Sequence, residues 1–300
     1  MKVLICDPVS ESAVNLIKEG GNEVTVQSDI TPEELMEAIP QYEVIVVRSR
    51  TKLRKPLLEK AKNLKLIVRG GVGIDNIDHK DAKEMGIEVR NTPAASSASV
   101  AELAIGHMFS LARHIPRATE SLKKGEWLKK KLKGTELAAK TLGIVGIGRI
   151  GKETAKRAKA LGMNVIAYDP YIKESGLEGV SMTDFDNLLS LSDYISLHIP
   201  HTDETHHLLS SSAFEKMKET SYLVNCARGG IIEEDALYDA LSNGKIAGAA
   251  FDVFETEPPV KNKLLSLDNF FCTPHIGAST KEGQARVGEE VAKIINEFEK

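Results

Sequence analysis

Residues 141–170 have the sequence TLGIVGIGRIGKETAKRAKALGMNVIAYDP, which combines several structural signals in a short space. The apolar run Leu142–Val145 predicts a strand that leads directly into a glycine-rich turn. An amphipathic pattern from about Ile150 to Leu161 predicts a helix, and Asn164–Tyr168 predicts a second strand. The segment therefore predicts a strand–turn–helix–strand unit, the building block of a parallel sheet.

The turn carries three glycines in the pattern GxGxxG, which is typical of dinucleotide-binding sites. Gly146 permits the tight turn, Gly148 lets a pyrophosphate approach the backbone, and Gly151 lets the helix pack close to the strand. The pyrophosphate would lie at the helix N-terminus, where unpaired N–H groups bind anions. Asp169, 18 residues after Gly151, has the spacing of an acid that binds the adenosine ribose, and it would repel a 2′-phosphate. We therefore predict that this turn binds a dinucleotide, and that the dinucleotide is NAD rather than NADP. The alternative is an ordinary strand-to-helix turn that binds no dinucleotide.

Strand and helix patterns alternate on both sides of this segment. In the first series we expect strands at Val3–Cys6, Glu23–Val26, Val44–Val47, Leu64–Val68 and Ile87–Val89, and helices around Ser10–Lys18, Pro32–Ile39, Pro56–Lys62 and Asp78–Met85. In the second series we expect strands near 142–146, 164–168, 193–197, 221–225, 246–251 and 270–272. Such alternation implies parallel sheets covered on both faces, so we predict an α/β fold with two doubly wound domains. A cleft between them is the expected reaction site.

A long helical stretch, roughly Ser97 to Leu122, separates the two series, and Pro116 predicts a kink within it. A basic run around Trp127 follows, and a closing helix is expected over Thr280–Phe298. Because the glycine turn comes so late, we expect the second domain to be inserted into a domain built from both chain ends. The stretch 97–133, with its tryptophan and apolar positions, makes a two-fold homodimer the expected assembly.

The composition is that of an ordinary globular chain of 300 residues, 42% hydrophobic and 27% charged. A net charge of −4 gives no basic surface for nucleic acid or an acidic membrane, so neither is an expected partner. The apolar run Val3–Cys6 is too short for a signal peptide, and we expect a cytoplasmic protein. Cys6, Cys226 and Cys272 lack CxxC spacing, which predicts neither a disulfide framework nor a zinc site.

Three loops at the expected carboxyl ends of later strands carry ionisable side chains: NCARGG contains Arg228, AFDVFETEPP contains Asp252, Glu255 and Glu257, and CTPHIGAS contains His275. The planar cation of Arg228 can bind a carboxylate and polarise a carbonyl; a structural salt bridge is the alternative. His275 is the best candidate proton carrier, because imidazole changes charge near neutral pH and reduction of a ketone needs one proton. An adjacent carboxylate such as Glu257 would favour the imidazolium.

In this order and spacing, GIVGIGRIG with YDP, NCARGG, DVFETEP and TPHIGAST resemble the D-isomer-specific 2-hydroxyacid dehydrogenase family over nearly the whole chain. The resemblance implies a Rossmann NAD-binding domain, residues 94–276, inserted into a flavodoxin-like substrate-binding domain formed by residues 1–93 and 277–300. It implies that Arg228 binds the substrate carboxylate and carbonyl, that His275 is the catalytic acid/base, and that Glu257 pairs with it. In the family's reaction a hydride passes between C4 of nicotinamide and C2 of a D-2-hydroxy acid.

The resemblance also implies that Asp252 contacts the nicotinamide amide and that residues from Pro200 to Thr205 line the adenine pocket. It gives Glu255 no role in catalysis or binding. The expected cofactor-binding residues are Gly146, Gly148, Arg149, Ile150, Gly151, Asp169, Pro200, Thr205, Cys226, Ala227, Asp252 and Gly277. No metal site is expected, because the adjacent histidines 206 and 207 point differently and no carboxylate has ligand spacing with them.

Further segments, RSRTK, RGGVGIDNID, NTPAASSASVAE and SLKKGEWLKKKLKGTEL, resemble the phosphoglycerate dehydrogenases of serine biosynthesis. The resemblance implies that Arg48, Arg69 and a residue supplied across a dimer interface surround a substrate phosphate, while the amides of Val72 and Gly73 hold its carboxylate. The third position is Lys129 where those enzymes have arginine, which keeps the charge but loses the bidentate fork. A solvated basic face is the alternative for this lysine run.

We therefore predict oxidation of D-3-phosphoglycerate to 3-phosphohydroxypyruvate. A glyoxylate or hydroxypyruvate reductase or another D-2-hydroxyacid dehydrogenase is the nearest alternative, since it would share every catalytic residue. A non-catalytic NAD-sensing protein similar to transcriptional corepressors is an alternative of another class. The sequence ends at Lys300, after the expected closing helix, so a C-terminal regulatory serine-binding domain and inhibition by serine are not expected.

Overall fold

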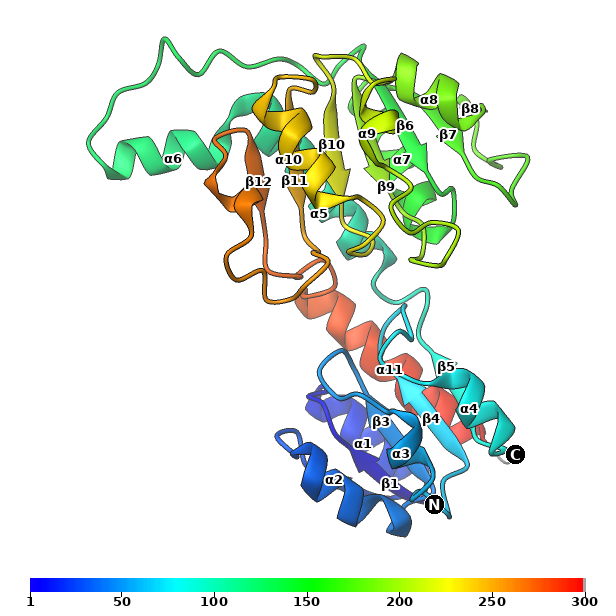
Figure 1. Cartoon of the computed structure of the whole chain (residues 1–300). Coiled ribbons are helices and arrows are strands. Elements are labelled where there is room, and N and C mark those ends of the chain that lie inside the picture. Colours follow the sequence, from blue (N-terminus) through cyan, green and yellow to red (C-terminus); the bar gives the residue numbers. More distant parts are fainter. Residues whose placement is uncertain (299–300) are drawn as a thin grey trace. The chain divides into compact units, whose positions relative to one another are not determined.

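The computed structural model describes residues 1–298, which divide into two compact units (Figure 1). Unit 1 comprises Met1–Ser96 and the segment from Ala278 onward, and unit 2 comprises Ser97–Gly277. These limits fall three residues and one residue after the boundaries expected from the sequence. Each unit contains one parallel sheet, and unit 2 is inserted into the chain of unit 1.

Unit 1 contains a five-stranded sheet in the order β2-β1-β3-β4-β5, with all strands parallel. Its strands are β1 Lys2–Ile5, β2 Glu23–Val26, β3 Val44–Val47, β4 Leu66–Arg69 and β5 Glu88–Asn91. Leu4 and Ile45 belong to the core cluster on one face of the sheet, and Val3 and Val44 to a second cluster. Burial on both faces explains why the central strands are continuous apolar runs. The order is the flavodoxin-like one, in which winding reverses between β1 and β3.

The helices of unit 1 are α1 Glu11–Glu19, α2 Pro32–Ala38, α3 Lys55–Leu58, α4 His79–Glu84 and α11 Lys281–Glu297, with a 3-10 turn at Ile39–Gln41. The last helix, α11, packs against α1 and β4, which returns the end of the chain to the first domain (Figure 1). The helix expected over Pro56–Lys62 is only one turn long. After Leu58 the chain continues in tight turns, with the Ala61 amide bonded to the Leu58 carbonyl at 3.0 Å.

Unit 2 contains a seven-stranded parallel sheet in the order β12-β11-β10-β9-β6-β7-β8. Its strands are β6 Thr141–Val145, β7 Asn164–Tyr168, β8 Val180–Met182, β9 Tyr194–Leu197, β10 Tyr222–Asn225, β11 Gly248–Phe251 and β12 Phe270–Cys272. This is the Rossmann order, in which winding reverses between β6 and β9. β8 was not expected from the sequence, because three residues at a sheet edge are too few to show a strand pattern.

The helices of unit 2 are α5 Ser97–Arg113, α6 Ile115–Lys123, α7 Arg149–Ala160, α8 Phe185–Leu191, α9 Ser211–Phe214 and α10 Glu234–Ser242, with a 3-10 turn at Lys263–Ser266. The prediction of one helix kinked at Pro116 was wrong. The helix breaks at His114, whose φ of 53° is left-handed, and Pro116 lies in the first turn of α6, where no N–H donor is needed. None of the helices in residues 1–298 is long and apolar enough to cross a membrane.

Candidate active site

In the turn after β6, each of the three glycines meets a different structural requirement. Gly146 has a φ of +95°, and a Cβ there would lie 2.7 Å from the His198 carbonyl oxygen. A Cβ on Gly151 would lie 2.1 Å from the Gly146 carbonyl oxygen, so α7 can approach β6 only without a side chain at this position. A Cβ on Gly148 would meet no atom of the described residues within 4 Å apart from its own local backbone, which leaves this position open to a ligand. These are the requirements of a pyrophosphate-binding turn, so the residues fit NAD.

The N-terminus of α7 is the anion-binding element of this turn. Gly148 is the N-cap residue, and no side chain among residues 1–298 caps the helix, so the first-turn N–H groups can bind an anion. Asp169 follows β7, and its Oδ2 accepts a hydrogen bond from the Ile147 amide at 3.1 Å. This bond places the carboxylate beside the glycine turn, as an acid that binds ribose hydroxyls requires. Arg149 is exposed and Ile150 is partly buried.

The loop after β9 lies next to this turn in the sheet. β9 pairs with β6, and the His198 amide donates to the Val145 carbonyl at 2.8 Å. Farther along, Thr205 closes the loop by donating from Oγ1 to the Pro200 carbonyl at 2.7 Å. The predicted adenine contacts Pro200 and Thr205 are therefore held in one turn on the strand adjacent to the glycine turn.

Arg228 lies in a loop after β10 that a buried asparagine shapes. Asn225, the last residue of β10, is only 1% exposed. Its Oδ1 accepts from the Ala227 amide at 3.0 Å and its Nδ2 donates to the Arg228 carbonyl at 2.9 Å. Cys226 is buried, and burial, with the nearby negative charge of Asp252, raises the pKa of its thiol well above the usual value. The Cys226 thiol thus stays protonated. Asn225 shapes the Arg228 loop and is a positioning residue that was not singled out from the sequence.

His275 and Glu257 form the pair that the sequence predicted. The Nδ1 atom of His275 lies 2.7 Å from Oε2 of Glu257, and Oε1 of Glu257 accepts from the Phe254 amide at 3.1 Å. Burial acts to raise the pKa of Glu257, but the hydrogen bond and charge of His275, the Phe254 amide and the charge of Arg228 together lower it. The carboxylate therefore remains ionised and holds Nδ1, which leaves Nε2 of His275 to exchange a proton.

Asp252 organises the loop that carries His275. The residue is 1% exposed; Oδ1 accepts from Thr273 Oγ1 at 2.5 Å and from the Ile276 amide at 2.8 Å, and Oδ2 accepts from the Gly277 amide at 2.7 Å. Buried His107 lies 3.2 Å from the same hydroxyl through Nε2. Burial lowers the pKa of His107 and the charge of Asp252 opposes this. The backbone on both sides of His275 is thus fixed, and its own φ of 53° is a strained conformation.

In unit 1 the predicted substrate residues lie at the carboxyl ends of neighbouring strands. Arg48 follows β3, and Arg69 is the last residue of β4, opposite Val47. A Cβ on Gly71, whose φ is +149°, would overlap the Arg69 guanidinium, which therefore lies against the Gly71 backbone. Val72 and Gly73 follow in the same loop and are partly buried. The structure thus gathers these residues at one edge of the unit 1 sheet.

The remaining candidates lie on exposed parts of unit 2. Lys129 is exposed in the segment between α6 and β6, and Trp127 is 78% exposed. Oε1 of Glu255 lies 3.0 Å from Nε2 of His207, whereas His275 pairs with Glu257. The His206 and His207 rings are stacked with centroids 3.9 Å apart, and the described residues contain no cluster of three ligands suited to a metal ion.

Comparisons with known proteins show which family the chain resembles. Residues 105–277 match the family model "D-isomer specific 2-hydroxyacid dehydrogenase, NAD binding domain". Over 298 residues the chain is 52% identical to a D-3-phosphoglycerate dehydrogenase of Methanocaldococcus jannaschii, covering 98% of this chain and 57% of that protein. It is 51% identical to a hydroxypyruvate reductase of Thermotoga maritima, covering 99% of this chain and 98% of that protein. The chain thus spans little more than half of the first relative.

A solved structure shows the same fold. The D-lactate dehydrogenase of Aquifex aeolicus, complexed with NAD and lactic acid, superposes with a TM-score of 0.85 at 33% identity, covering 99% of this chain and 95% of that one.

Proposed function

The chain belongs to the D-isomer specific 2-hydroxyacid dehydrogenase family, and we propose that it oxidises D-3-phosphoglycerate to 3-phosphohydroxypyruvate with NAD⁺. The observation that carries the dehydrogenase assignment is the His275–Glu257 pair, 2.7 Å apart, with the charge of Arg228 acting on the same carboxylate. The substrate rests on Arg48 and Arg69, two cations on neighbouring strands, and on the 52% identity to a D-3-phosphoglycerate dehydrogenase.

In this proposal, side chains of the protein accept the proton of the substrate hydroxyl and neutralise the charges that develop in the reaction. Bound NAD⁺ supplies an acceptor for the hydride that leaves C2 of the substrate. Nε2 of His275 takes the proton of the C2 hydroxyl, so the alcohol loses one hydride and one proton and becomes a ketone. Ionised Glu257 stabilises the imidazolium that results. Arg228 neutralises the substrate carboxylate and the charge that develops on the oxygen.

The phosphate of the substrate is assigned to the edge of unit 1. Arg48 and Arg69 would bind it, because guanidinium groups match phosphate geometry and keep their charge. Lys129 of a second copy would add a point charge, which requires a homodimer. In support of a dimer, Trp127 and Leu122 are 78% and 58% exposed on the segment that includes Lys129.

Hydroxypyruvate reduction is the second candidate, because the Thermotoga maritima relative at 51% identity carries that name and matches this chain over nearly its full length. The two functions differ in whether the substrate has a phosphate. A substrate without one has no need for two arginines at the edge of unit 1.

A substrate panel with NAD and NADP tests the proposal. It contains 3-phosphoglycerate, glycerate and lactate in one direction, and phosphohydroxypyruvate, hydroxypyruvate and glyoxylate in the other. We expect the highest kcat/KM for the phosphorylated pair with the NAD cofactor. We also expect Arg48→Ala to raise the KM for 3-phosphoglycerate about 10- to 100-fold through lost charge-assisted hydrogen bonds. A higher kcat/KM for hydroxypyruvate than for phosphohydroxypyruvate would favour the second candidate, and no turnover with any compound would remove both.

A further inference from the structure

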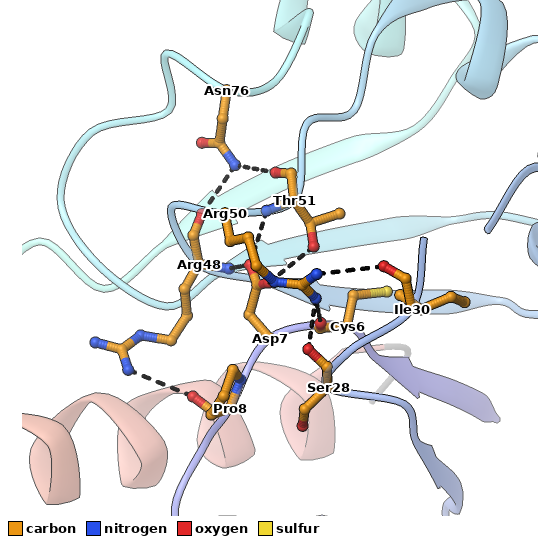
Figure 2. Close-up of polar contacts among 9 residues, drawn as sticks. All are labelled: Cys6, Asp7, Pro8, Ser28, Ile30, Arg48, Arg50, Thr51 and Asn76. Atoms are coloured by element: carbon orange, nitrogen blue, oxygen red, sulfur yellow. Dashed lines mark hydrogen bonds and ion pairs between the residues drawn. The ribbon is translucent and has the colours of Figure 1, made fainter. Parts of the chain in front are cut away.

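Asp7, two residues after β1, is the centre of a polar network in unit 1 (Figure 2). Its side chain is only 1% exposed and its carboxylate accepts four hydrogen bonds. Oδ2 accepts from the amides of Arg48 at 2.5 Å and Thr51 at 3.2 Å. Oδ1 accepts from Thr51 Oγ1 at 2.8 Å and from Arg50 Nε at 3.1 Å. One buried carboxylate therefore fixes the turn 48–51 at the end of β3.

Arg50 ties this network to the rest of the sheet edge. Its Nη2 donates to the carbonyls of Cys6 and Ser28, both at 2.5 Å, and its Nη1 donates to the Ile30 carbonyl at 3.3 Å. Together with the bond to Asp7, all three guanidinium nitrogens of Arg50 have protein acceptors. Although its side chain is 49% exposed, Arg50 is thus a link between segments of the domain and not a group held ready for a ligand.

Arg48, two residues earlier, has the opposite arrangement. Its backbone is held at both polar atoms, since its amide donates to Asp7 and its carbonyl accepts from Asn76 Nδ2 at 2.8 Å. Asn76 also donates to the Thr51 carbonyl at 2.6 Å. Within residues 1–298 the Arg48 guanidinium makes one long hydrogen bond, from Nη1 to the Pro8 carbonyl at 3.4 Å. In Figure 2 it points away from the Arg50 guanidinium. Arg48 thus combines a fixed backbone with a guanidinium group that is bonded to only one acceptor within residues 1–298.

The network lies where a sheet of this order binds ligands. Asp7 and Arg48 follow β1 and β3, which pair directly although β2 lies between them in the sequence. The sheet reverses its winding there, and ligands of such sheets bind outside the carboxyl ends of the strands at this point. A cation meant for a ligand in this place needs a rigid support, because a shift of about 1 Å in a contacting group can cost about 100-fold in rate.

We propose that Asp7 and Arg50 are positioning residues that hold Arg48 for the anionic group of the substrate. The inference rests on the proposed function, in which Arg48 contacts the substrate. It adds that the two arginines of RSRTK have different tasks, one of them binding and the other supporting.

The test compares Arg50→Ala and Asp7→Asn with the unchanged enzyme, using the panel substrate that has the highest kcat/KM. We expect the KM for that substrate to rise about tenfold, while kcat and the KM for NAD stay within about twofold. Arg54→Ala is the matched control, because Arg54 also forms an arginine–aspartate pair in unit 1, with Asp78 at 2.8 Å. The control should leave every constant unchanged. If a variant does not fold, Arg50→Lys replaces it; this change keeps the charge, loses the fork and should give an intermediate KM.

Arg48→Ala and the double variant Arg48→Ala/Arg50→Ala separate positioning from general stability. If Arg50 acts through Arg48, the second substitution adds nothing to the KM of the first. Equal effects of Arg50→Ala with and without Arg48 would overturn the inference, and so would an unchanged KM in folded Arg50→Ala and Asp7→Asn. If Arg48→Ala leaves the KM of the preferred substrate unchanged, Arg48 has nothing to be positioned for and the inference also fails. If the preferred substrate has no phosphate but the variants still behave as expected, only the proposed substrate is wrong.

Discussion

Each of the two sheets reverses its winding at one point, between β6 and β9 in unit 2 and between β1 and β3 in unit 1. In unit 2 the anion site at this point is made of backbone: the glycine turn and the uncapped N-terminus of α7 offer N–H groups, and Gly148 leaves room for the ligand. In unit 1 the corresponding place presents a side chain, Arg48, on a turn that Asp7 and Arg50 hold. Both sheet edges thus present positive charge to an anion, unit 2 through backbone N–H groups and unit 1 through an arginine side chain.

The two kinds of anion site are damaged by different changes. A backbone site depends on conformation and close packing, so adding one methyl group can damage it. A side-chain site depends on partners that are distant in the sequence, and it fails when one partner is removed.

His275→Ala should have the largest effect. It removes the group that exchanges the proton, and kcat should fall about 100- to 10,000-fold. NAD affinity, measured by calorimetry, should stay within about twofold because the predicted cofactor site is formed by other residues. His207→Ala is the matched control, since His207 also contacts a carboxylate, Glu255, at 3.0 Å, and its kcat should not change. A His275→Ala enzyme with normal turnover would remove this residue from the proposed role.

Two glycine variants should separate two requirements of the backbone site, the close packing of α7 against β6 and the approach of the ligand to the turn. In Gly151→Ala the new methyl group meets the Gly146 carbonyl at 2.1 Å, so the free energy of unfolding should fall by about 1–3 kcal/mol and NAD affinity should fall as well. In Gly148→Ala the methyl group enters open space, so stability should change by less than about 0.5 kcal/mol while NAD affinity falls about tenfold.

Gly106→Ala on α5 is the control, since a Cβ there also meets no atom within 4 Å and NAD affinity should not change. Urea unfolding and calorimetry give both quantities for all three variants. Normal NAD binding by Gly148→Ala would show that the ligand does not approach this backbone.

The contrast also explains how much of the molecule could be predicted from its sequence. The glycine turn, the strands beside it and Asp169 lie within 30 residues, and each glycine expresses a local conformational need. The positions of His275 and Glu257 after strand ends made them candidates, and the family resemblance implied that they form a pair. The edge strand β8 and the helix break at His114 were missed, because a three-residue strand and a single left-handed residue leave little trace in a hydrophobic pattern.

The supports of the sites could not be predicted in this way. Arg48 and Arg50 occupy equivalent positions in RSRTK, and nothing local distinguishes them. The family resemblance singled out Arg48 and gave Arg50 no task. The contacts of Arg50 appear only when β1 and β3 pair and bring Asp7 beside a turn more than 40 residues away in the sequence. The same holds for Asp252, which clamps the loop of His275. Such contacts depend on tertiary structure.

The last prediction concerns the response of the two units to acid. Burial lowers the pKa of His198 to about 3; its Nδ1 is shielded from solvent and its Nε2 lies 3.0 Å from Ser196 Oγ. The unfolded chain binds a proton near the ordinary pKa of 6.5, so the stability that neutral His198 provides is present above pH 6.5 and falls as pH drops from there toward 3. Between pH 7 and 5 this one group should reduce the free energy of unfolding of unit 2 by about 2 kcal/mol.

In unit 1 the only histidine is the exposed His79 on α4, so its amides should lose less protection over this range. Hydrogen exchange, corrected for the intrinsic pH dependence of amide exchange, follows the two units separately. His198→Gln should reduce the acid sensitivity of unit 2 and leave the part that comes from His107, whose pKa burial also lowers. His79→Gln should leave both units unchanged. Equal acid sensitivity of the two units in the unchanged protein would contradict this prediction, because then groups common to both sheets, and not the shielded histidines of unit 2, would set the response to acid.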